Sequence, residues 1–267
     1  DERATSGYPS YVGAAEFRNA VGKWLNQRFG VALDPATQIT STIGAKEAVF
    51  HFAEGFVDPG DLVIAPSPGY PPYTRGTLFA EGKTWYYPLL RENGFLPDFS
   101  KIPSDVAKAA KIFWINYPQN PTGACAPPKV YEDAIRFCRD NDIILASDEA
   151  YSEIYFGALP PSALQLESKG VVVFHSLSKR SAMTGYRVGF VAGDPEIVQV
   201  FKKVKTNIDS GTPTFIQDAA VAALSDEAHV KEMRDEYRAK RDVLVDALTS
   251  IGLENCSPEG TLYVLSL

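Results

Sequence analysis

Short apolar runs alternate along most of this chain with longer segments in which apolar residues recur every three or four positions. The runs have the length and the β-branched and aromatic content of buried strands. They lie at 61–67, 84–90, 111–116, 143–147, 171–175 and 187–193. Two of the longer segments, 126–142 and 194–208, have proline near their start and apolar residues on one face, as amphipathic helices do. This alternation predicts an α/β fold with a mostly parallel sheet and helices on both faces.

The pattern changes at about residue 225. From there the sequence predicts one long, charged amphipathic helix, followed by the segment CSPEGTLYVLSL. We therefore expect a large α/β domain over residues 1–225, and over 226–267 a connecting helix that leads into a small, incomplete α+β domain. The first residues lack a typical start and the last match a strand that is cut short, so we also expect a longer natural polypeptide.

Composition narrows the class of protein. The chain has 267 residues, of which 45% are hydrophobic and 22% charged, as is typical of a globular protein. Its net charge of −7 argues against a nucleic acid or an anionic membrane as partner, and no apolar run is long enough to span a bilayer. The three cysteines fit no metal spacing, and the three histidines are far apart. We expect no metal site and, without a signal peptide, a cytoplasmic location.

Side chains suited to chemistry follow four of the expected strands. They are Tyr70 after 61–67, Asn120 after 111–116, Asp148 and Tyr151 after 143–147, and Ser176, Ser178 and Lys179 after 171–175. In an open parallel sheet, ligands bind beyond the carboxyl ends of the strands. We therefore expect these side chains to gather at one edge of the sheet.

An anion site is also expected, although neither common nucleotide-binding glycine motif is present. The segment STIGAKEAVF predicts a glycine turn that opens a helix, with free backbone amides near Gly44, Ala45 and Lys46. Arg187 and the nearby serine hydroxyls would add donors for a phosphate.

One ligand makes use of all these groups, namely pyridoxal phosphate. Its aldehyde forms a Schiff base with a lysine, and its phosphate needs an anion site. Its pyridine nitrogen needs an acid in order to stay protonated, its phenolic oxygen needs hydrogen-bond donors, and its flat face suits an aromatic ring.

Five segments resemble motifs of the class I/II aminotransferases, which are fold-type-I enzymes of vitamin B6. They are GAKEA, PGYP, NPTG, SDEAY and SLSKRSAMTGYRVG, and they occur in the family's order over nearly the whole chain. The resemblance implies an aminotransferase that moves an amino group between an amino acid and a 2-oxo acid, through a Schiff base of pyridoxal phosphate on Lys179. The last segment leans toward the bacterial branch with aspartate, aromatic and succinyldiaminopimelate aminotransferases.

The resemblance also implies a role for each site residue. Lys179 would carry the cofactor and move the substrate proton, and Asp148 would pair with the pyridine nitrogen. Tyr70 would stack on the ring, Asn120 and Tyr151 would hold its phenolic oxygen, and Arg187 would bind the phosphate. A cis peptide bond at Asn120–Pro121 is expected on the same grounds.

Each of these residues also has a purely structural interpretation. Lys179 could extend to solvent from a strand end, Asp148 could cap a helix and Asn120 could form a turn. Tyr70 could be a core aromatic residue, and Arg187 could form a surface ion pair.

The resemblance bears on assembly as well. Tyr8 resembles a family tyrosine that reaches the phosphate of the neighbouring subunit, which implies a homodimer with shared active sites, and 207–220 resembles the interface loop. A packed loop tyrosine is the plain alternative for Tyr8. No position matches the arginine with which the family binds the substrate carboxylate. Two other functions stay open, a C–S β-lyase on the same scaffold and a non-catalytic sensor domain.

Overall fold

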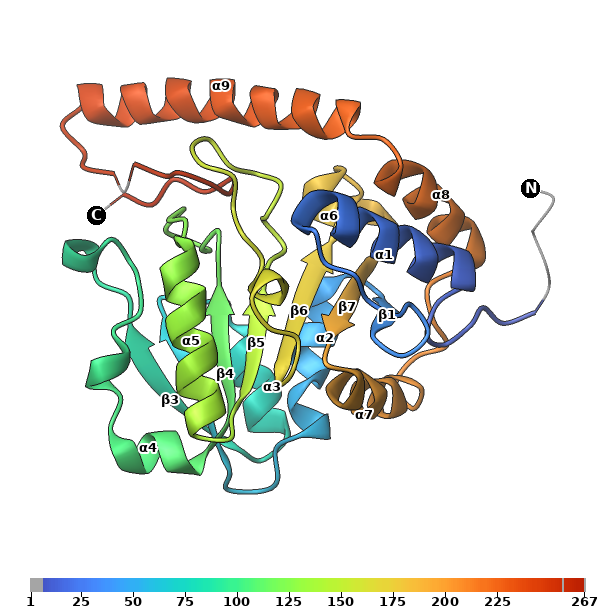
Figure 1. Cartoon of the computed structure of the whole chain (residues 1–267). Helices are drawn as coiled ribbons and strands as arrows, with labels where there is room; N and C mark the ends of the chain where they lie inside the picture. Colours follow the sequence, from blue (N-terminus) through green and yellow to red (C-terminus); the bar gives the residue numbers. More distant parts are fainter. Residues whose placement is uncertain (1–6, 256, 267) are drawn as a thin grey trace.

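A seven-stranded sheet forms the centre of the computed structural model, which describes residues 7–255 and 257–266 (Figure 1). Its strands lie side by side in the order β1-β7-β6-β5-β4-β2-β3, and only β7 runs against its neighbours. The strands are β1 Ile39–Thr42, β2 Leu62–Ser67, β3 Lys83–Pro88, β4 Ala110–Asn116, β5 Ile144–Asp148, β6 Val171–Ser176 and β7 Gly189–Gly193. The expected mostly parallel α/β fold is thereby confirmed.

Helices cover both faces of this sheet. They are α1 Ala15–Phe29, α2 Ala45–His51, α3 Pro72–Phe79, α4 Ser104–Ala109, α5 Pro128–Asp140, α6 Leu177–Arg180, α7 Pro195–Lys205, α8 Thr214–Leu224 and α9 Ala228–Ser250. Side chains of α1, α5 and α8 belong to the apolar core on one face, and those of α2, α3 and α7 to the core on the other. Figure 1 shows α1 and α5 in front of the sheet.

Strand β4 shows why both faces are apolar. Ile112 and Trp114 belong to the core with α2, α3 and α7, whereas Phe113 and Ile115 belong to the core with α1 and α5. Successive side chains of a strand point to opposite faces, so a strand covered on both sides is usually apolar at successive positions. This accounts for the continuous apolar runs in the sequence.

The helix boundaries follow from local sequence. The Asp194 side chain accepts hydrogen bonds from the backbone amides of Glu196 and Ile197, and so caps the start of α7. Helix α1 ends at Gly30, which adopts a left-handed conformation that glycine takes up without strain. Helix α5 begins at Pro128, where a missing amide hydrogen costs no helical hydrogen bond.

The structure differs from the sequence-based expectations at three places. The short strand β1 was not expected, because three of the four residues in its sequence ITST carry hydroxyl groups, although all four are buried. The expected interface loop 207–220 is a loop only in its first part, since α8 begins at Thr214. In 260–266 the described residues make only isolated bridges, Tyr155 with Gly260 and Asn255 with Ser266, rather than the expected strand.

Helix α9 lies across the loop that joins β5 and β6 (Figure 1). Arg234 donates a hydrogen bond to the carbonyl of Glu153 at 3.2 Å, and Arg238 donates one to the carbonyl of Phe156 at 2.7 Å. The division into domains 1–225 and 226–267 stays a prediction.

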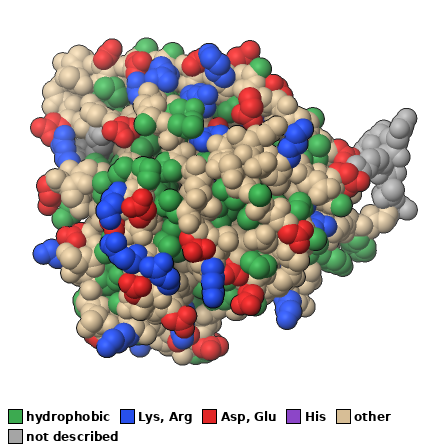
Figure 2. Space-filling model, viewed as in Figure 1, with side chains coloured by type: hydrophobic (Ala, Val, Ile, Leu, Met, Phe, Trp, Pro, Cys, Tyr) green, Lys and Arg blue, Asp and Glu red, His purple; other side chains and the backbone are tan. Residues whose placement is uncertain are grey.

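The surface shows acidic and basic side chains interspersed on the face drawn in Figure 2. No helix within the described ranges combines the length and the apolar character needed to cross a bilayer.

Candidate active site

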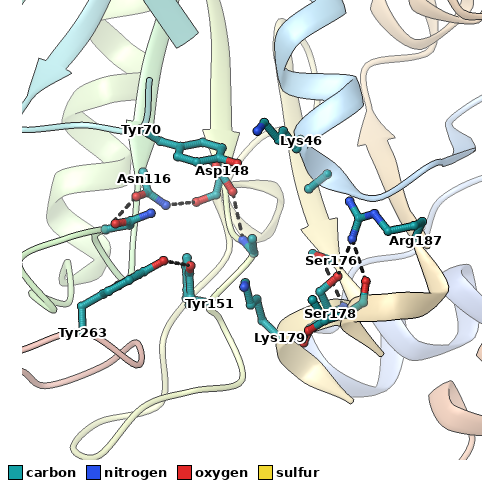
Figure 3. A pocket seen from close by; sticks show the side chains of 14 residues that line it. Lys46, Tyr70, Asn116, Asp148, Tyr151, Ser176, Ser178, Lys179, Arg187 and Tyr263 are labelled. Carbon is teal, nitrogen blue, oxygen red and sulfur yellow. Dashed lines mark hydrogen bonds between the residues drawn. The ribbon is translucent and has the colours of Figure 1, made fainter. Parts of the chain in front are cut away.

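A cavity of about 180 Å³ lies at the edge of the sheet where β4, β5 and β6 end. It contains every residue proposed above for the cofactor except Gly44 and Tyr8 (Figure 3). Its lining consists of Ala45, Lys46, Tyr70, Asn116, Asn120, Asp148, Ala150, Tyr151, Ser176, Ser178, Lys179, Thr184, Arg187 and Tyr263. The parallel order of these strands thus brings together residues that are far apart in the sequence.

Asp148 is the buried acid of the cavity, with 5% of its surface exposed. The Tyr73 hydroxyl donates a hydrogen bond to its Oδ2 at 2.6 Å, and the Ala150 amide donates one to its Oδ1 at 3.1 Å. Burial raises the pKa of Asp148, while the Tyr73 hydrogen bond opposes that rise. The bond to Ala150 is the local contact expected of a cap, but a turn rather than a helix follows Asp148.

Asn116 ties the neighbouring strand to this acid. It pairs with Asp148 in the register of β4 and β5, and its side-chain amide donates to the Asp148 carbonyl at 2.9 Å. Its side-chain oxygen accepts from the Asn120 amide at 2.8 Å, which fixes the loop after β4. The expected cis peptide bond at Asn120–Pro121 is confirmed.

Lys179 extends into the cavity between Tyr151 and the Ser176–Ser178 side (Figure 3). It lies on α6, which directly follows β6, and its Nζ is 5.6 Å from the centre of the Tyr151 ring. Ser176 caps this short helix, since its side chain accepts from the Ser178 amide at 3.2 Å. The side chain is half-buried in the cavity, which departs from the interpretation of a lysine that extends to solvent.

Arg187 lies on the Ser176–Ser178 side of the cavity, across from Asp148 (Figure 3). Its Nη1 donates to Ser178 Oγ at 3.3 Å and to the Thr184 carbonyl at 2.9 Å, and it makes no ion pair with any residue in the described part of the chain. A Cβ on Gly44 would overlap its Nη2. Only glycine therefore allows this guanidinium to approach the turn before α2, where Gly44 has a φ of +74°.

Three tyrosines stand at the cavity. Burial, together with the charge of Asp148, raises the pKa of Tyr70, whose ring centre is 5.8 Å from that of Tyr73. The Tyr151 and Tyr263 hydroxyls are 3.1 Å apart, and burial raises the pKa of Tyr151. Both Tyr70 and Tyr151 therefore stay protonated near neutral pH and can donate hydrogen bonds.

Sequence reasoning missed Asn116, Tyr263 and Tyr73. Asn116 is the last residue of an expected strand, so the rule that located Asp148 also applies to it. Tyr263 and Tyr73 reach the site through tertiary packing, and no local motif marks them.

Two residues considered in the sequence lie away from the cavity lining. Tyr8 is outside the cavity, with 83% of its surface exposed. Glu149 is fully buried, and its Oε2 is 3.3 Å from His175 Nε2.

The residues present fit pyridoxal phosphate. Arg187, Ser176 and Ser178 place a charged fork and two hydroxyls on one side of the cavity, which suits a phosphate. Asp148 is a buried carboxylate that gains from a cationic partner, because burial disfavours its charge. Lys179 supplies the amine between these two regions.

The sequence profile described as "Aminotransferase class I and II" matches residues 1–267. The chain belongs to this family. It is 48% identical over 261 residues to the LL-diaminopimelate aminotransferase of Aquifex aeolicus, covering 96% of this chain and 67% of that protein. It is 46% identical over 262 residues to that of Nitratidesulfovibrio vulgaris strain Hildenborough, covering 96% and 68%.

Solved structures of aminotransferases have the same fold. Substrate-bound BacF from Bacillus subtilis superposes with a TM-score of 0.94 at 32% identity, covering 97% of this chain and 67% of that one. A single mutant of the aspartate aminotransferase of Thermus thermophilus gives a TM-score of 0.93 at 30% identity, covering 97% and 69%. The chain thus spans about two thirds of the length of the proteins it matches.

Membership in the family establishes the class of reaction. The protein is a pyridoxal-phosphate-dependent aminotransferase, whose substrates are amino acids and 2-oxo acids. The matches do not favour the β-lyase or the sensor domain that the sequence left open.

Proposed function

We propose that this protein transfers an amino group from LL-diaminopimelate to a 2-oxo acid, using a cofactor site built on Lys179 and Asp148. The meeting of an amine, a buried acid and an anion site in one cavity carries the assignment of the site. The substrate is inferred from relatives that are 43–48% identical over nearly the whole chain and are named LL-diaminopimelate aminotransferases.

Bound pyridoxal phosphate supplies an electron sink for the negative charge that develops at the substrate α-carbon. In our proposal, the Lys179 amine carries the cofactor and later moves the proton at that carbon, because it is the basic group in the middle of the cavity. The Asp148 carboxylate stabilises positive charge on the pyridine nitrogen. Both effects lower the barrier, since charge develops next to groups that are already oriented.

The remaining residues hold and orient. Arg187, Ser176 and Ser178 would bind the phosphate, together with the backbone at Gly44, Ala45 and Lys46. Tyr70 would cover the ring, and Asn120 and Tyr151 would donate to the phenolic oxygen.

We further propose a homodimer in which Tyr8 completes the neighbouring subunit's site. Tyr8 is exposed and lies away from the cavity of its own chain, which supports a role across a subunit boundary. Tyr11, Ile208 and Phe215 are likewise exposed apolar side chains of the N-terminal segment and the α7–α8 region, and contact with a second copy would bury them.

Half-reaction spectroscopy tests the substrate. The protein loaded with pyridoxal phosphate is mixed with LL-diaminopimelate, aspartate or tyrosine in the absence of any 2-oxo acid. We expect the visible absorbance of the bound cofactor to fall fastest with LL-diaminopimelate as the cofactor is converted to its amino form. A faster change with aspartate or tyrosine would contradict the proposed substrate. Release of pyruvate and ammonia from added cystathionine, which unlike these three amino acids has a sulfur leaving group on its β-carbon, would instead indicate a C–S β-lyase.

A further inference from the structure

Tyr73 is a fully buried tyrosine beneath the cavity. It lies in the first turn of α3 with 1% of its surface exposed, and it does not line the cavity. Its ring stacks on Trp114 with ring centres 4.7 Å apart and an interplanar angle of 19°. The ring is therefore held in place on the β4 side, so its hydroxyl has a defined direction.

That hydroxyl points at the acid of the site. The 2.6 Å distance from Tyr73 Oη to Asp148 Oδ2 is short, as expected when a hydroxyl donates to a carboxylate. The Ala150 amide holds the other carboxylate oxygen, so both oxygens of Asp148 have a fixed partner. Burial, with the charge of Asp148, keeps the pKa of Tyr73 well above its ordinary value, so this phenol remains a donor.

We propose that Tyr73 is the positioning residue of Asp148: its phenol fixes the orientation of the carboxylate and favours its ionised form in the buried site. The inference rests on the proposed pairing of Asp148 with the cofactor's ring nitrogen. Tyr73 acts through Asp148 and is not itself a catalytic residue, since a second side chain lies between it and the cavity.

Other titratable groups also face Asp148. They are Tyr70, Tyr151, Glu149 and His175. The Glu149 side chain is directed away, because its Oε1 accepts from Ser147 Oγ and from the Ala163 amide, both at 2.9 Å, and its Oε2 faces His175. Among the described side chains, only Tyr73 donates a hydrogen bond to the Asp148 carboxylate, and the other donor is the Ala150 backbone amide.

The experiment measures the affinity of the apoprotein for pyridoxal phosphate between about pH 5 and pH 8, by quenching of tryptophan fluorescence. A protonated Asp148 must release its proton before it can pair with a protonated ring nitrogen, so affinity falls as pH drops below the carboxyl's pKa. Tyr73→Phe removes a donor to the ionised form and should raise that pKa. We expect its affinity to be about tenfold below wild type at the acid end, with a smaller difference at neutral pH.

Tyr87→Phe is the matched control. Tyr87 is also a buried tyrosine, stacked on Phe113, and it donates to the Trp114 carbonyl at 2.9 Å rather than to Asp148. Removing the Tyr87 hydroxyl should leave the pH dependence of the affinity for pyridoxal phosphate unchanged. The ionisations of the cofactor are common to all variants and cancel in the comparison.

Asp148→Asn, alone and combined with Tyr73→Phe, completes a double-mutant cycle. We expect Tyr73→Phe to add nothing in the Asp148→Asn background. Wild-type affinity of Asp148→Asn at every pH would show that the pairing proposed for Asp148 is wrong. If Asp148→Asn weakens binding, the inference about Tyr73 is overturned by a wild-type pH profile of Tyr73→Phe, by a loss equal at every pH, or by an effect that persists in the double variant.

Discussion

At the scale of single residues, the polar groups of the cavity differ in how deeply they are buried. Asp148 and Tyr151 are buried deeply enough for desolvation to raise their pKa values, so their protonation depends on their neighbours. Lys179 is only half-buried and stands between the acid and the anion side. A lysine amine inside the cavity can react with an aldehyde that binds there. The other lysine of the cavity, Lys46, is exposed at its wall.

Lys179→Ala should prevent covalent attachment of pyridoxal phosphate and abolish turnover without unfolding the protein. The reason is that the variant lacks the amine that forms the bond and later moves the proton. Treatment with borohydride followed by peptide mass spectrometry locates the modified lysine, and circular dichroism checks the fold. If the cofactor still attaches to Lys179→Ala but no longer attaches to Lys46→Ala, then Lys46 forms the bond and the role proposed for Lys179 is wrong.

At the scale of elements, the turn between β1 and α2 and the segment around Arg187 form the anion side together. Their closeness depends on glycine, because a Cβ at Gly44 would overlap the Arg187 guanidinium. Gly44 also has φ +74° and ψ 159°, a conformation that is essentially restricted to glycine.

Gly44→Ala should displace the Arg187 guanidinium and weaken cofactor binding by about tenfold or more, since one charge-assisted contact to the phosphate is lost. Fluorescence titration measures the affinity. Gly30→Ala is the control: Gly30 also has a positive φ, of +70°, but a Cβ there would have no neighbour within 4 Å. That variant should keep wild-type affinity, and an equal loss in both would argue against the role of the turn.

Helix α2 also carries a half-buried acid, Glu47, whose pKa is raised by desolvation. A carboxyl with a folded-state pKa above its unfolded value stabilises the fold while it is protonated, and this contribution is lost as pH rises through the folded-state pKa. Glu47→Gln should therefore gain stability relative to wild type as pH increases from acid to neutral. Urea unfolding at acid and at neutral pH measures the free energy of unfolding of both proteins. Glu132→Gln, at an exposed position, is the control. If the stability of Glu47→Gln relative to wild type instead fell toward neutral pH, the predicted direction of the pH dependence would be wrong.

At the scale of the whole molecule, the exposed apolar side chains Tyr8, Tyr11, Ile208 and Phe215 fit a protein that pairs with a second copy. A symmetric dimer presents the same patch twice, so a residue outside its own cavity can reach that of its partner.

Mixing Tyr8→Ala with Lys179→Ala subunits should restore activity that neither variant has alone. A hybrid dimer contains one site with both an intact Lys179 and an intact Tyr8, so random exchange should give about a quarter of wild-type activity. Sedimentation velocity first establishes that a dimer forms, and the assay follows subunit exchange. A dimer that shows no recovery on mixing would exclude the sharing of Tyr8, and a monomer with full activity would exclude the dimer.

Local sequence was sufficient to predict every strand of the sheet except β1, and most of the cavity. Continuous apolar runs mark strands that are covered on both faces, and parallel strands bring their carboxyl ends to one edge, so Asp148, Asn120 and Lys179 could be assigned to one site before the fold was known. Strand β1 was missed because its sequence is polar although the strand is buried, and this burial arises from tertiary contacts, among them those with β7 and the N-terminal segment.

Contacts between distant segments depend instead on how the elements pack. Tyr73 and Asp148 are 75 positions apart, and Tyr151 and Tyr263 are 112 apart. Whether such side chains meet is set by the docking of α3 on the sheet and by the path of the chain after α9. Periodicity specifies which face of an element is buried, but it carries no information about which residue of another element it will face.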